Sequence, residues 1–505
     1  MMPDSNTSRL VFNGIDAATG DYLLPPLGAD VISKIARNEP LDERHLQELR
    51  YRYQRSSKVT LGPVAGVDPT KLDQSGWAVI FAHNTPLPVR DALKPLLEHR
   101  KTQAGKYYRE YAGPNGYRPN ESKLDFLARH GAGPGPADPG KVPYYLMIVG
   151  DPESIPFRFQ YQLDVQYAVG RIAFDTVEEY ANYARSVVDA ETRPVALSRT
   201  AVFFGTQNNG DDATNLSATE LVDPLASQIG SKLKPDTPPW KIRKLLGAQA
   251  TKSALASVLG GTETPAFLFT ATHGVGFPAD DSRQIGHQGA LLCQDWPGPS
   301  EKKPISQDYY FSRDDLGKET NPFGLVAFFF ACYGAGTPRL DDFAHAAFKD
   351  TRTTIAPHAF LAGLPRRLLG HPKGGALAVV GHVERAWGYS FNWDKAGRQL
   401  QSFESTLKQL MDGHPLGSAM EFFNERYAEL SSHLADELEE IKFGKTPNDF
   451  ALAGLWTANN DARSYVIIGD PAVRVAVPAA GQPPQPRPQE ELSRADPGSE
   501  RVRLG

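Results

Sequence analysis

Seven short apolar runs constrain the fold of this chain more than any other feature. They do not alternate with polar residues, which is typical of strands in a parallel sheet that is covered on both faces. Helix-like segments lie between the runs, and strands that alternate with helices predict an α/β fold. We expect a three-layer α/β/α sandwich with a mostly parallel sheet, in two adjacent subdomains. The runs cover residues 77–83, 144–151, 200–207, 266–274, 325–334, 376–383 and 465–470.

Three segments between the runs have helical patterns. Residues 176–191 begin with a threonine and carry glutamates in the first turn, which is a favourable N-terminal cap. Residues 220–233 are similar, with Pro224 near their start. Residues 418–443 predict a long amphipathic helix. Its apolar residues recur every three or four positions: Met420, Phe423, Tyr427, Leu430, Leu434, Leu438 and Ile441.

Composition divides the chain into four parts, since 505 residues are too many for one ordinary core. Residues 1–75 are polar and form an N-terminal extension of unknown fold. Residues 76–198 are expected to form a first α/β subdomain, and residues 199–477 a second, larger one. Residues 478–505 are rich in proline and are expected to be disordered, because they cannot bury enough apolar surface to become ordered.

Charge and hydropathy exclude several classes of partner. A net charge of −5 and a pI near 6.2 predict no nucleic-acid partner, because binding phosphates requires a basic face. No run approaches the length of a membrane-spanning helix, so no membrane partner is expected. The amino terminus does not resemble a secretory signal, and the only cysteines are Cys293 and Cys332. We therefore expect a cytoplasmic protein without disulfides.

No cofactor is expected. His287, His371 and His382 have no companion residue at a spacing typical of metal ligands. The acidic stretch 279–284 has no calcium-binding pattern and is interpreted as a solvated loop. The chain also lacks the glycine-rich motifs that bind nucleotide phosphates.

Two of the apolar runs end in residues with distinctive chemistry. One ends in His273 and Gly274, and the other ends in Cys332. If the two strands are parallel neighbours, both side chains emerge at the same sheet edge, where α/β proteins bind ligands. An imidazole can then act as acid and base for a thiol. A cysteine at the end of an apolar strand is also common as inert core, so the residues alone leave both interpretations open.

The pair of strand ends resembles the caspase-like cysteine peptidases, a group that includes caspases, legumains, separases, gingipains and bacterial CHAT domains. Members carry an apolar strand ending in His-Gly, followed by one ending in Ala-Cys; here these are AFLFTATHG and LVAFFFACYG. The chain is most similar to the gingipain-like and CHAT-type bacterial members. The resemblance covers about residues 76–476. Further similar segments are 144–160, 167–183, 289–296, 311–316, 374–391 and 465–475.

The resemblance implies a role for each motif residue and makes 199–477 the catalytic subdomain. Cys332 would be the nucleophile that forms a thioester, and His273 would protonate the leaving amine and activate water. The N–H groups of Gly274 and Cys332 would form the oxyanion hole. Gln207 and Asn208 stand where gingipain-like sequences have an acidic residue that orients the histidine, so a Cys–His dyad is expected.

The same resemblance suggests a specificity pocket. Asp211 and Asp212 lie near the position of an acidic residue at the pocket floor, and Trp387 matches its aromatic wall. An acid and an aromatic face would select Arg or Lys before the scissile bond. Alternatively, 208–215 is a polar turn that caps a helix, and Trp387 is core. Cys293 is interpreted as packed core.

The sequence therefore predicts a cysteine endopeptidase that acts on a protein or peptide substrate. Limited proteolysis of a genomically linked partner, such as a gasdermin-like pore former, in bacterial antiviral defence or cell death is a finer hypothesis. Two alternatives remain at this stage: a catalytically inactive caspase-like module that binds proteins, and a non-peptidase thiol acyl hydrolase with the same dyad.

Overall fold

The computed structural model describes residues 9–10, 27–28, 34, 62–193, 197–233, 238–317, 320–341, 353–393, 396–478, 482–485 and 487. The chain has two compact units, Met1–Thr60 and Leu61–Gly505. In the first unit, β1 (Arg9–Leu10) pairs with β2 (Leu27–Gly28) in antiparallel orientation. Most of the predicted extension 1–75 and of the predicted disordered tail 478–505 lies outside the described residues.

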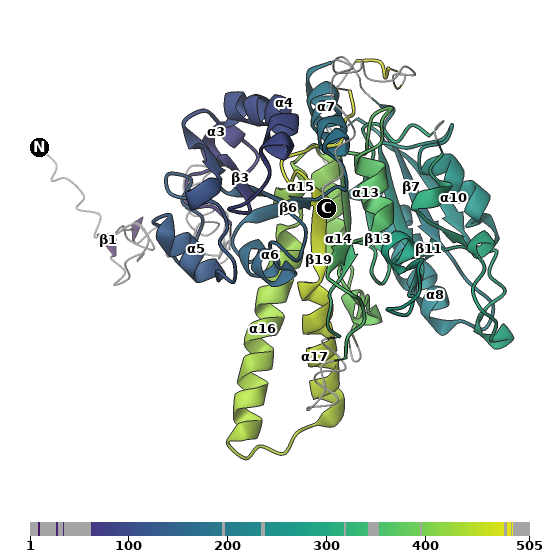
Figure 1. The fold of residues 1–505 in the computed structure, drawn as a ribbon. Helices are drawn as coiled ribbons and strands as arrows, with labels where there is room; N and C mark the ends of the chain where they lie inside the picture. Colours follow the sequence, from purple (N-terminus) through teal and green to yellow (C-terminus); the bar gives the residue numbers. More distant parts are fainter. Residues whose placement is uncertain are drawn as a thin grey trace, which may run out of the picture. The chain divides into compact units, whose positions relative to one another are not determined.

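The second unit is built on a ten-stranded sheet (Figure 1). Every pair of neighbours is parallel except β16 with β19, so two parallel halves run in opposite directions and meet at this pair. The predicted α/β class with a mostly parallel sheet is confirmed. The strands are, in spatial order, β4 (Tyr108–Tyr111), β3 (Trp77–Phe81), β5 (Tyr145–Val149), β6 (Ala168–Ile172), β19 (Tyr465–Gly469), β16 (Ala378–His382), β13 (Val326–Phe330), β9 (Phe267–Ala271), β7 (Thr200–Gly205) and β8 (Lys241–Leu246).

All seven apolar runs form strands of this sheet, and their side chains are buried almost throughout. The sequence missed β4, β6 and β8. Two of these, β4 and β8, are the edge strands, which can carry polar residues because one side of the strand is unpaired. The third, β6, contains the fully buried Arg171, whose guanidinium donates to the carbonyls of Gly150 and Ile155 instead of facing water.

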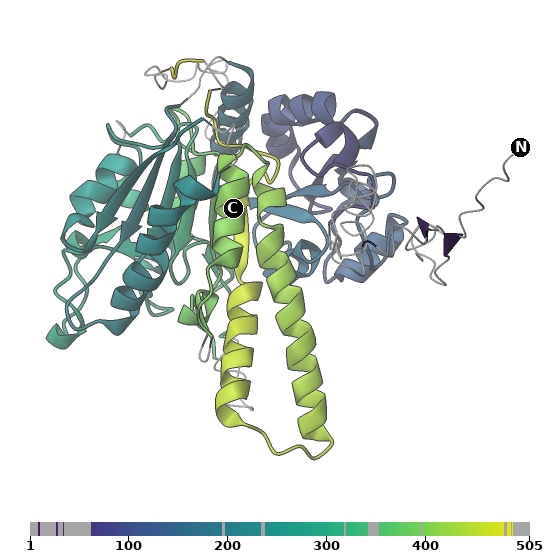
Figure 2. The same cartoon turned by 180° about the vertical axis from the view of Figure 1, so that it is seen from behind.

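Helices cover both faces of the sheet. On the face toward the viewer in Figure 1 lie α7 (Val177–Thr192) and α13 (Gly363–Leu369); α9 (Asp223–Lys232) and α14 (Gln401–Met411) lie on the face seen in Figure 2. The predicted cap of α7 is a capping box between Thr176 and Glu179. No helix within the described residues is long and apolar enough to cross a membrane.

A helical hairpin extends beyond the sheet (Figures 1 and 2). It consists of α16 (Glu421–Lys442) and α17 (Asp449–Arg463). The predicted apolar stripe of the 418–443 helix is buried only in its first half, at Met420, Phe423 and Leu430. Further along, Leu438 is 48% exposed, so the amphipathic pattern continues past the point where the helix contacts the core.

A buried ionic cluster joins the end of β19 to two helices. Arg100, on α4 (Leu87–Ala104), donates from Nε to Asp470 at 2.7 Å and makes two bonds of 2.7 Å to Glu191 on α7. Asp470 is fully buried and also accepts from the indole N–H of Trp77 at 3.0 Å. Burial alone would raise the pKa of Glu191, but the charge of Arg100 and the hydrogen bonds lower it to about 2. The cluster therefore holds the last strand against the first half of the unit.

We predict that Arg100→Met destabilises the protein by about 3–5 kcal/mol, because Asp470 and Glu191 stay buried without their cation. The matched control is Arg193→Met, which removes a bond of 2.9 Å to Asp189 from an arginine that is 53% exposed. This control should cost less than about 1 kcal/mol. Urea unfolding followed by tryptophan fluorescence measures both variants, and equal losses would contradict the role of the cluster. Since the pKa of Glu191 is depressed from 4.5, its contribution to stability should disappear as the pH falls from there toward 2.

Candidate active site

His273 and Cys332 leave the sheet side by side. The strands β9 and β13 are parallel neighbours, and their last register pair is Ala271 with Phe330. His273 and Cys332 each lie two residues beyond that pair. The proximity that the sequence predicted is therefore a direct result of the register of these two strands.

Gly274 permits a very close approach between the two strand ends. It begins β10 (Gly274–Val275), which belongs to a separate three-stranded sheet with β11 (Ala290–Leu292) and β12 (Tyr310–Phe311). A Cβ atom on Gly274 would lie 1.7 Å from the carbonyl oxygen of Cys332, far inside contact distance. Only glycine fits at this position without moving the backbone of the cysteine.

Two backbone N–H groups near the thiol are free of carbonyl partners. Leu292 donates to the carbonyl of His273 at 2.9 Å, so the next pair, Gly274 with Leu291, is the non-hydrogen-bonded pair of this ladder. The N–H of Gly274 therefore does not point at β11. The N–H of Cys332 likewise has no carbonyl partner among the described residues. This arrangement is compatible with the predicted oxyanion hole.

The imidazole has an acidic partner that the sequence did not identify. Nε2 of His273 lies 2.8 Å from Oδ2 of Asp211. Asp211 is also the N-cap of α8 (Asp212–Ser217), where it accepts from the backbone N–H of Thr214 at 3.3 Å and from its hydroxyl at 2.6 Å. The sequence assigned Asp211 to the floor of a specificity pocket. Its carboxylate is instead turned toward His273, because the cap geometry fixes it there.

The charge state of Asp211 suits this contact. Burial would raise its pKa, but the hydrogen bonds from Thr214 and His273 outweigh burial, so the pKa lies below its ordinary value. Asp211 is therefore ionised at neutral pH. An ionised carboxylate at Nε2 holds the ring proton on that nitrogen and leaves Nδ1 with a free lone pair.

Gln207 and Asn208 hold the loop after β7 against the segment 293–296 through hydrogen bonds. Gln207 exchanges two hydrogen bonds of 2.7 Å with the side chain of Gln294. The amide nitrogen of Asn208 donates to the carbonyls of Cys293 and Trp296 at 3.1 and 3.0 Å. The indole ring of Trp296 in turn meets the imidazole ring of His273 edge-on, with centroids 6.2 Å apart. These residues position the loop beside the imidazole, and Cys293 is fully buried core, as predicted.

The residue Cys332 is half-buried, and burial of its thiol favours the protonated form. Burial raises its pKa above the ordinary value, while the N–H of Ala386, 3.3 Å from Sγ, and the charge of Arg385 act in the opposite direction. Arg385 is held by Asp341 through two bonds of 2.9 and 2.7 Å. Within the described residues, no hydrogen bond joins the thiol to the imidazole of His273. The thiol and the imidazole therefore lie at the same sheet edge without a hydrogen bond between them in this structure.

The backbone beside the thiol is strained. Tyr333 follows the cysteine with φ of 58°, and Glu384 has φ of 81°, in a region that non-glycine residues rarely occupy. The N–H of Tyr333 donates to the carbonyl of Glu384 at 2.5 Å, which couples the two strained positions. Strain of this kind persists where the surrounding structure fixes the backbone, and here it turns the chain sharply after Cys332.

A buried carboxylate that the sequence gave no reason to select organises the wall next to the thiol. Asp461, on α17, is fully buried. It accepts from the backbone N–H of Trp387 at 2.9 Å, lies 3.1 Å from Nε2 of His382, and bonds the hydroxyl of Ser390. Because Ala386 directly precedes Trp387 and contacts the thiol, Asp461 fixes this loop against Cys332.

Trp387 and Asp212 lie on elements that touch each other. Trp387 is half-buried and precedes η8 (Gly388–Ser390), which packs against α8. A Cβ atom on Gly388 would lie 3.4 Å from Leu216 of that helix. Asp212 is the first residue of α8; it is exposed, and no described residue pairs with its carboxylate. Of the two predicted pocket aspartates, Asp212 alone is therefore open to a ligand.

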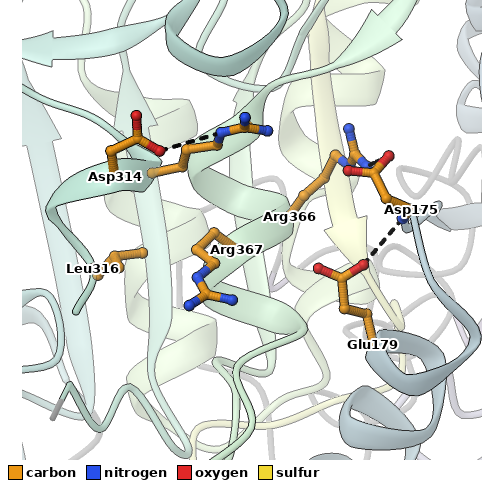
Figure 3. Close-up of a pocket in the computed structure, with 8 residues that line it drawn as sticks. Asp175, Glu179, Asp314, Leu316, Arg366 and Arg367 are labelled. Atoms are coloured by element: carbon orange, nitrogen blue, oxygen red, sulfur yellow. Dashed lines mark hydrogen bonds and ion pairs between the residues drawn. The ribbon is translucent and has the colours of Figure 1, made fainter. Parts of the chain in front are cut away.

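A cleft of about 480 Å³ contains none of these residues (Figure 3). Its lining holds three carboxylates and three guanidinium groups. Arg366 pairs with Asp175, and Arg313 lies 3.5 Å from Asp314. Among the described residues, no three His, Cys, Asp or Glu side chains gather as metal ligands anywhere in the fold. The lining residues of the cleft are Asp175, Glu179, Arg313, Asp314, Leu316, Gly363, Arg366 and Arg367.

Comparison with protein families gives the class of the protein. The model of peptidase family C25 matches residues 78–476, which is most of the chain. The chain belongs to peptidase family C25. It is therefore a cysteine peptidase that acts on protein or peptide substrates, and the resemblance to gingipains is confirmed at the level of the family.

Solved structures similar to this C25 peptidase are distant in sequence. One, described as "Structure of Protease", is 13% identical, covers 83% of this chain and 80% of that chain, and has a TM-score of 0.47. Another is the complex of the Porphyromonas gingivalis RgpB pro- and mature domains, which is 13% identical, covers 79% of this chain and 80% of that chain, and has a TM-score of 0.44. No curated protein matches the sequence.

We predict that Gly274→Ala lowers peptidase activity by at least about 10²-fold, because the new methyl group displaces the backbone of Cys332 and reacting groups lose their alignment. Gly276→Ala is the matched control, since the nearest atom to its Cβ would be on the Tyr333 ring at 3.6 Å, an ordinary contact. Hydrolysis of a fluorogenic peptide by both variants measures the effect. Similar activity in the two would show that the close approach at Gly274 is not needed.

Proposed function

We propose that this C25 peptidase uses Cys332 as nucleophile, His273 as general acid and base, and Asp211 to orient His273. The observation that carries the proposal is the bond of 2.8 Å between His273 and Asp211, at the sheet edge where Cys332 also emerges. A thiol, an imidazole and a carboxylate in this order form the constellation that activates nucleophiles in acyl transfer.

The first half-reaction forms an acyl-enzyme. Because the ring proton of His273 is held on Nε2 by Asp211, its Nδ1 can accept the thiol proton as Sγ of Cys332 attacks the peptide carbonyl. The tetrahedral intermediate collapses when the C–N bond breaks and Nδ1 returns the proton to the leaving amine. A thioester between Cys332 and the acyl part of the substrate remains.

The second half-reaction hydrolyses the thioester and restores the free enzyme. Nδ1 of His273 takes a proton from water as the water oxygen attacks the thioester carbon. The C–S bond then breaks, the acyl part leaves as a carboxylic acid, and Nδ1 returns the proton to Sγ of Cys332, which regenerates the thiol. In both steps the negative oxygen would accept from the N–H groups of Gly274 and Cys332, which have no carbonyl partner in the described structure. One such donor typically contributes about 3 kcal/mol to transition-state stabilisation.

A preference for Arg or Lys before the scissile bond is the finer part of the proposal. It rests on Asp212 and Trp387: an exposed carboxylate at the start of α8, and an aromatic side chain next to the turn that packs against α8. A cationic side chain would pair with the carboxylate and lie against the indole ring. Asp211 is not assigned to this pocket, because its carboxylate is hydrogen-bonded to His273.

The remaining sequence hypotheses stand as predictions. An inactive binding module has no need for a carboxylate, an imidazole and a thiol in register, so the geometry favours a working enzyme over that alternative. A thiol acyl hydrolase that accepts esters is tested by comparing amide, ester and thioester substrates. The role in bacterial defence, the genomically linked substrate and the cytoplasmic location stay predictions.

The test of the mechanism is hydrolysis of a fluorogenic peptide library that varies the residue before the scissile bond. Cys332→Ala and His273→Ala should abolish turnover, and Asp211→Asn should lower kcat by about 10²-fold or more, because the imidazole loses its tautomer and orientation. Cys293→Ala is the matched control and should retain activity. Undiminished turnover by Cys332→Ala would contradict the proposal.

The test of specificity is Asp212→Asn. Cleavage after Arg and Lys should fall by about tenfold or more in kcat/KM, because a charged hydrogen bond is lost, while any cleavage after neutral residues should be unaffected. Asp73→Asn, which changes an exposed carboxylate on α3 (Leu72–Ser75), is the control. An unchanged preference for Arg and Lys in Asp212→Asn would remove this residue from the pocket.

A further inference from the structure

The far half of the α16–α17 hairpin has no fully buried side chain. Residues 431–453, called the arm below, include no buried side chain, whereas the near half of the hairpin packs through Leu430, Ala458 and Ala462. The described chain has five large, exposed hydrophobic side chains, and three of them lie on the arm. These are Leu438 at 48%, Phe443 at 79% and Phe450 at 62% exposed.

Two phenylalanines at the tip of a projecting element favour a binding role. Burying a Phe side chain stabilises a protein by about 1.5–3 kcal/mol relative to leaving it exposed. The two exposed phenylalanines do not contribute this stabilisation to the fold, and polar residues would serve equally well at a tip with no binding role. Exposed apolar side chains that gather in one place mark interaction sites. Elsewhere in the described chain, exposed large hydrophobics occur singly, at Leu87 and Leu124.

The base of the hairpin is part of the active-site wall. Asp461 on α17 bonds the backbone of Trp387, and Arg426 on α16 donates to the carbonyl of Tyr389 at 2.7 Å. Tyr389 and Trp393 pack into the cluster that joins the two helices. The arm therefore extends from the sheet edge at which Cys332 lies, as Figures 1 and 2 show for the hairpin as a whole. A polypeptide bound along the arm and continuing past its base would reach the sheet edge at which Cys332 lies.

The charge of the arm indicates what kind of polypeptide fits. It carries five carboxylates and two lysines. Lys445 is used internally, because it bonds Glu437 at 2.7 Å and Glu440 at 2.6 Å. The net charge of the arm is negative. It would therefore repel an anionic membrane surface and a second copy of the same arm. The charges left outside the Lys445 pairs are those of Asp436, Glu439, Asp449 and Lys442.

We propose that the arm is a docking site for the protein substrate, which it binds through apolar side chains flanked by basic residues, and that it presents the adjoining segment to Cys332. This inference rests on the proposed function, since a preference for Arg or Lys selects substrates that are basic near the cleavage site. The arm then adds affinity for long chains that a short peptide cannot use.

The test compares one arm variant on three substrates. The double variant Phe443→Ser/Phe450→Ser changes two exposed positions, and Leu87→Ser/Leu124→Ser is the matched control at exposed positions elsewhere. The substrates are a short fluorogenic peptide, reduced and alkylated lysozyme as a basic polypeptide, and reduced and alkylated α-lactalbumin as an acidic one. We expect the arm variant to lose about tenfold in kcat/KM on lysozyme, with less than about twofold change on the peptide.

Two further results are expected. Wild-type enzyme should prefer lysozyme to α-lactalbumin, and this preference should shrink when the ionic strength is raised from about 0.01 M to about 1 M, where charges are screened. The proposal is overturned if the arm variant cleaves lysozyme as well as wild type does, or if both double variants lose equally. Loss of anionic-vesicle binding or of self-association in the arm variant, with unchanged lysozyme cleavage, would assign the tip to a membrane or to a second copy.

Failure of the proposed function gives a different result. If the wild-type enzyme cleaves no peptide, the arm is tested by fluorescence anisotropy of labelled lysozyme binding to Cys332→Ala, with and without the two phenylalanine substitutions. Weaker binding with the substitutions supports the arm independently of turnover, and equal binding overturns it.

Discussion

The parallel pairing of β9 with β13 is the constraint on which the candidate active site depends. Its register sets His273 and Cys332 at equivalent heights, and the missing side chain of Gly274 lets the two strand ends close together. The other components approach this pair from outside the two strands. Asp211 comes from the loop after β7, and Ala386 from the loop after β16. Neighbouring strands of one sheet thus contribute one group each, which is how an α/β sheet edge commonly assembles a site.

Much of this arrangement could be predicted from the sequence, for a physical reason. Strands buried on both faces leave continuous apolar runs, and all seven runs are strands of the central sheet. Edge strands lack that signature, so β4 and β8 were missed. The thiol and imidazole were identifiable because each ends such a run, and the resemblance to a peptidase family rests on the same residues.

The roles of the acidic residues were harder to predict. Asp211 lies in a polar loop, where a helix cap, a pocket floor and a partner for His273 all require the same residue type, so the choice needs the direction of the carboxylate. Asp461 lies inside a helix and is separated by more than seventy residues from the loop that it organises. No local pattern reveals such a contact. The projection of the hairpin beyond the sheet could not be predicted either. An amphipathic stripe predicts a helix, but it is the same whether or not another element covers its apolar side.

The position of β19 has a consequence for the order in which the protein can assemble. This strand lies between β6 and β16, yet it is the last strand of the sheet to be synthesised. Until it emerges from the ribosome, β6 and β16 both present an unpaired edge, and the two halves of the sheet have no strand to join them. Closure therefore depends on contacts between residues hundreds of positions apart, which favours slow folding. A chain that stops before residue 465 would have every group of the proposed catalytic site and still lack the strand that makes the two halves one sheet.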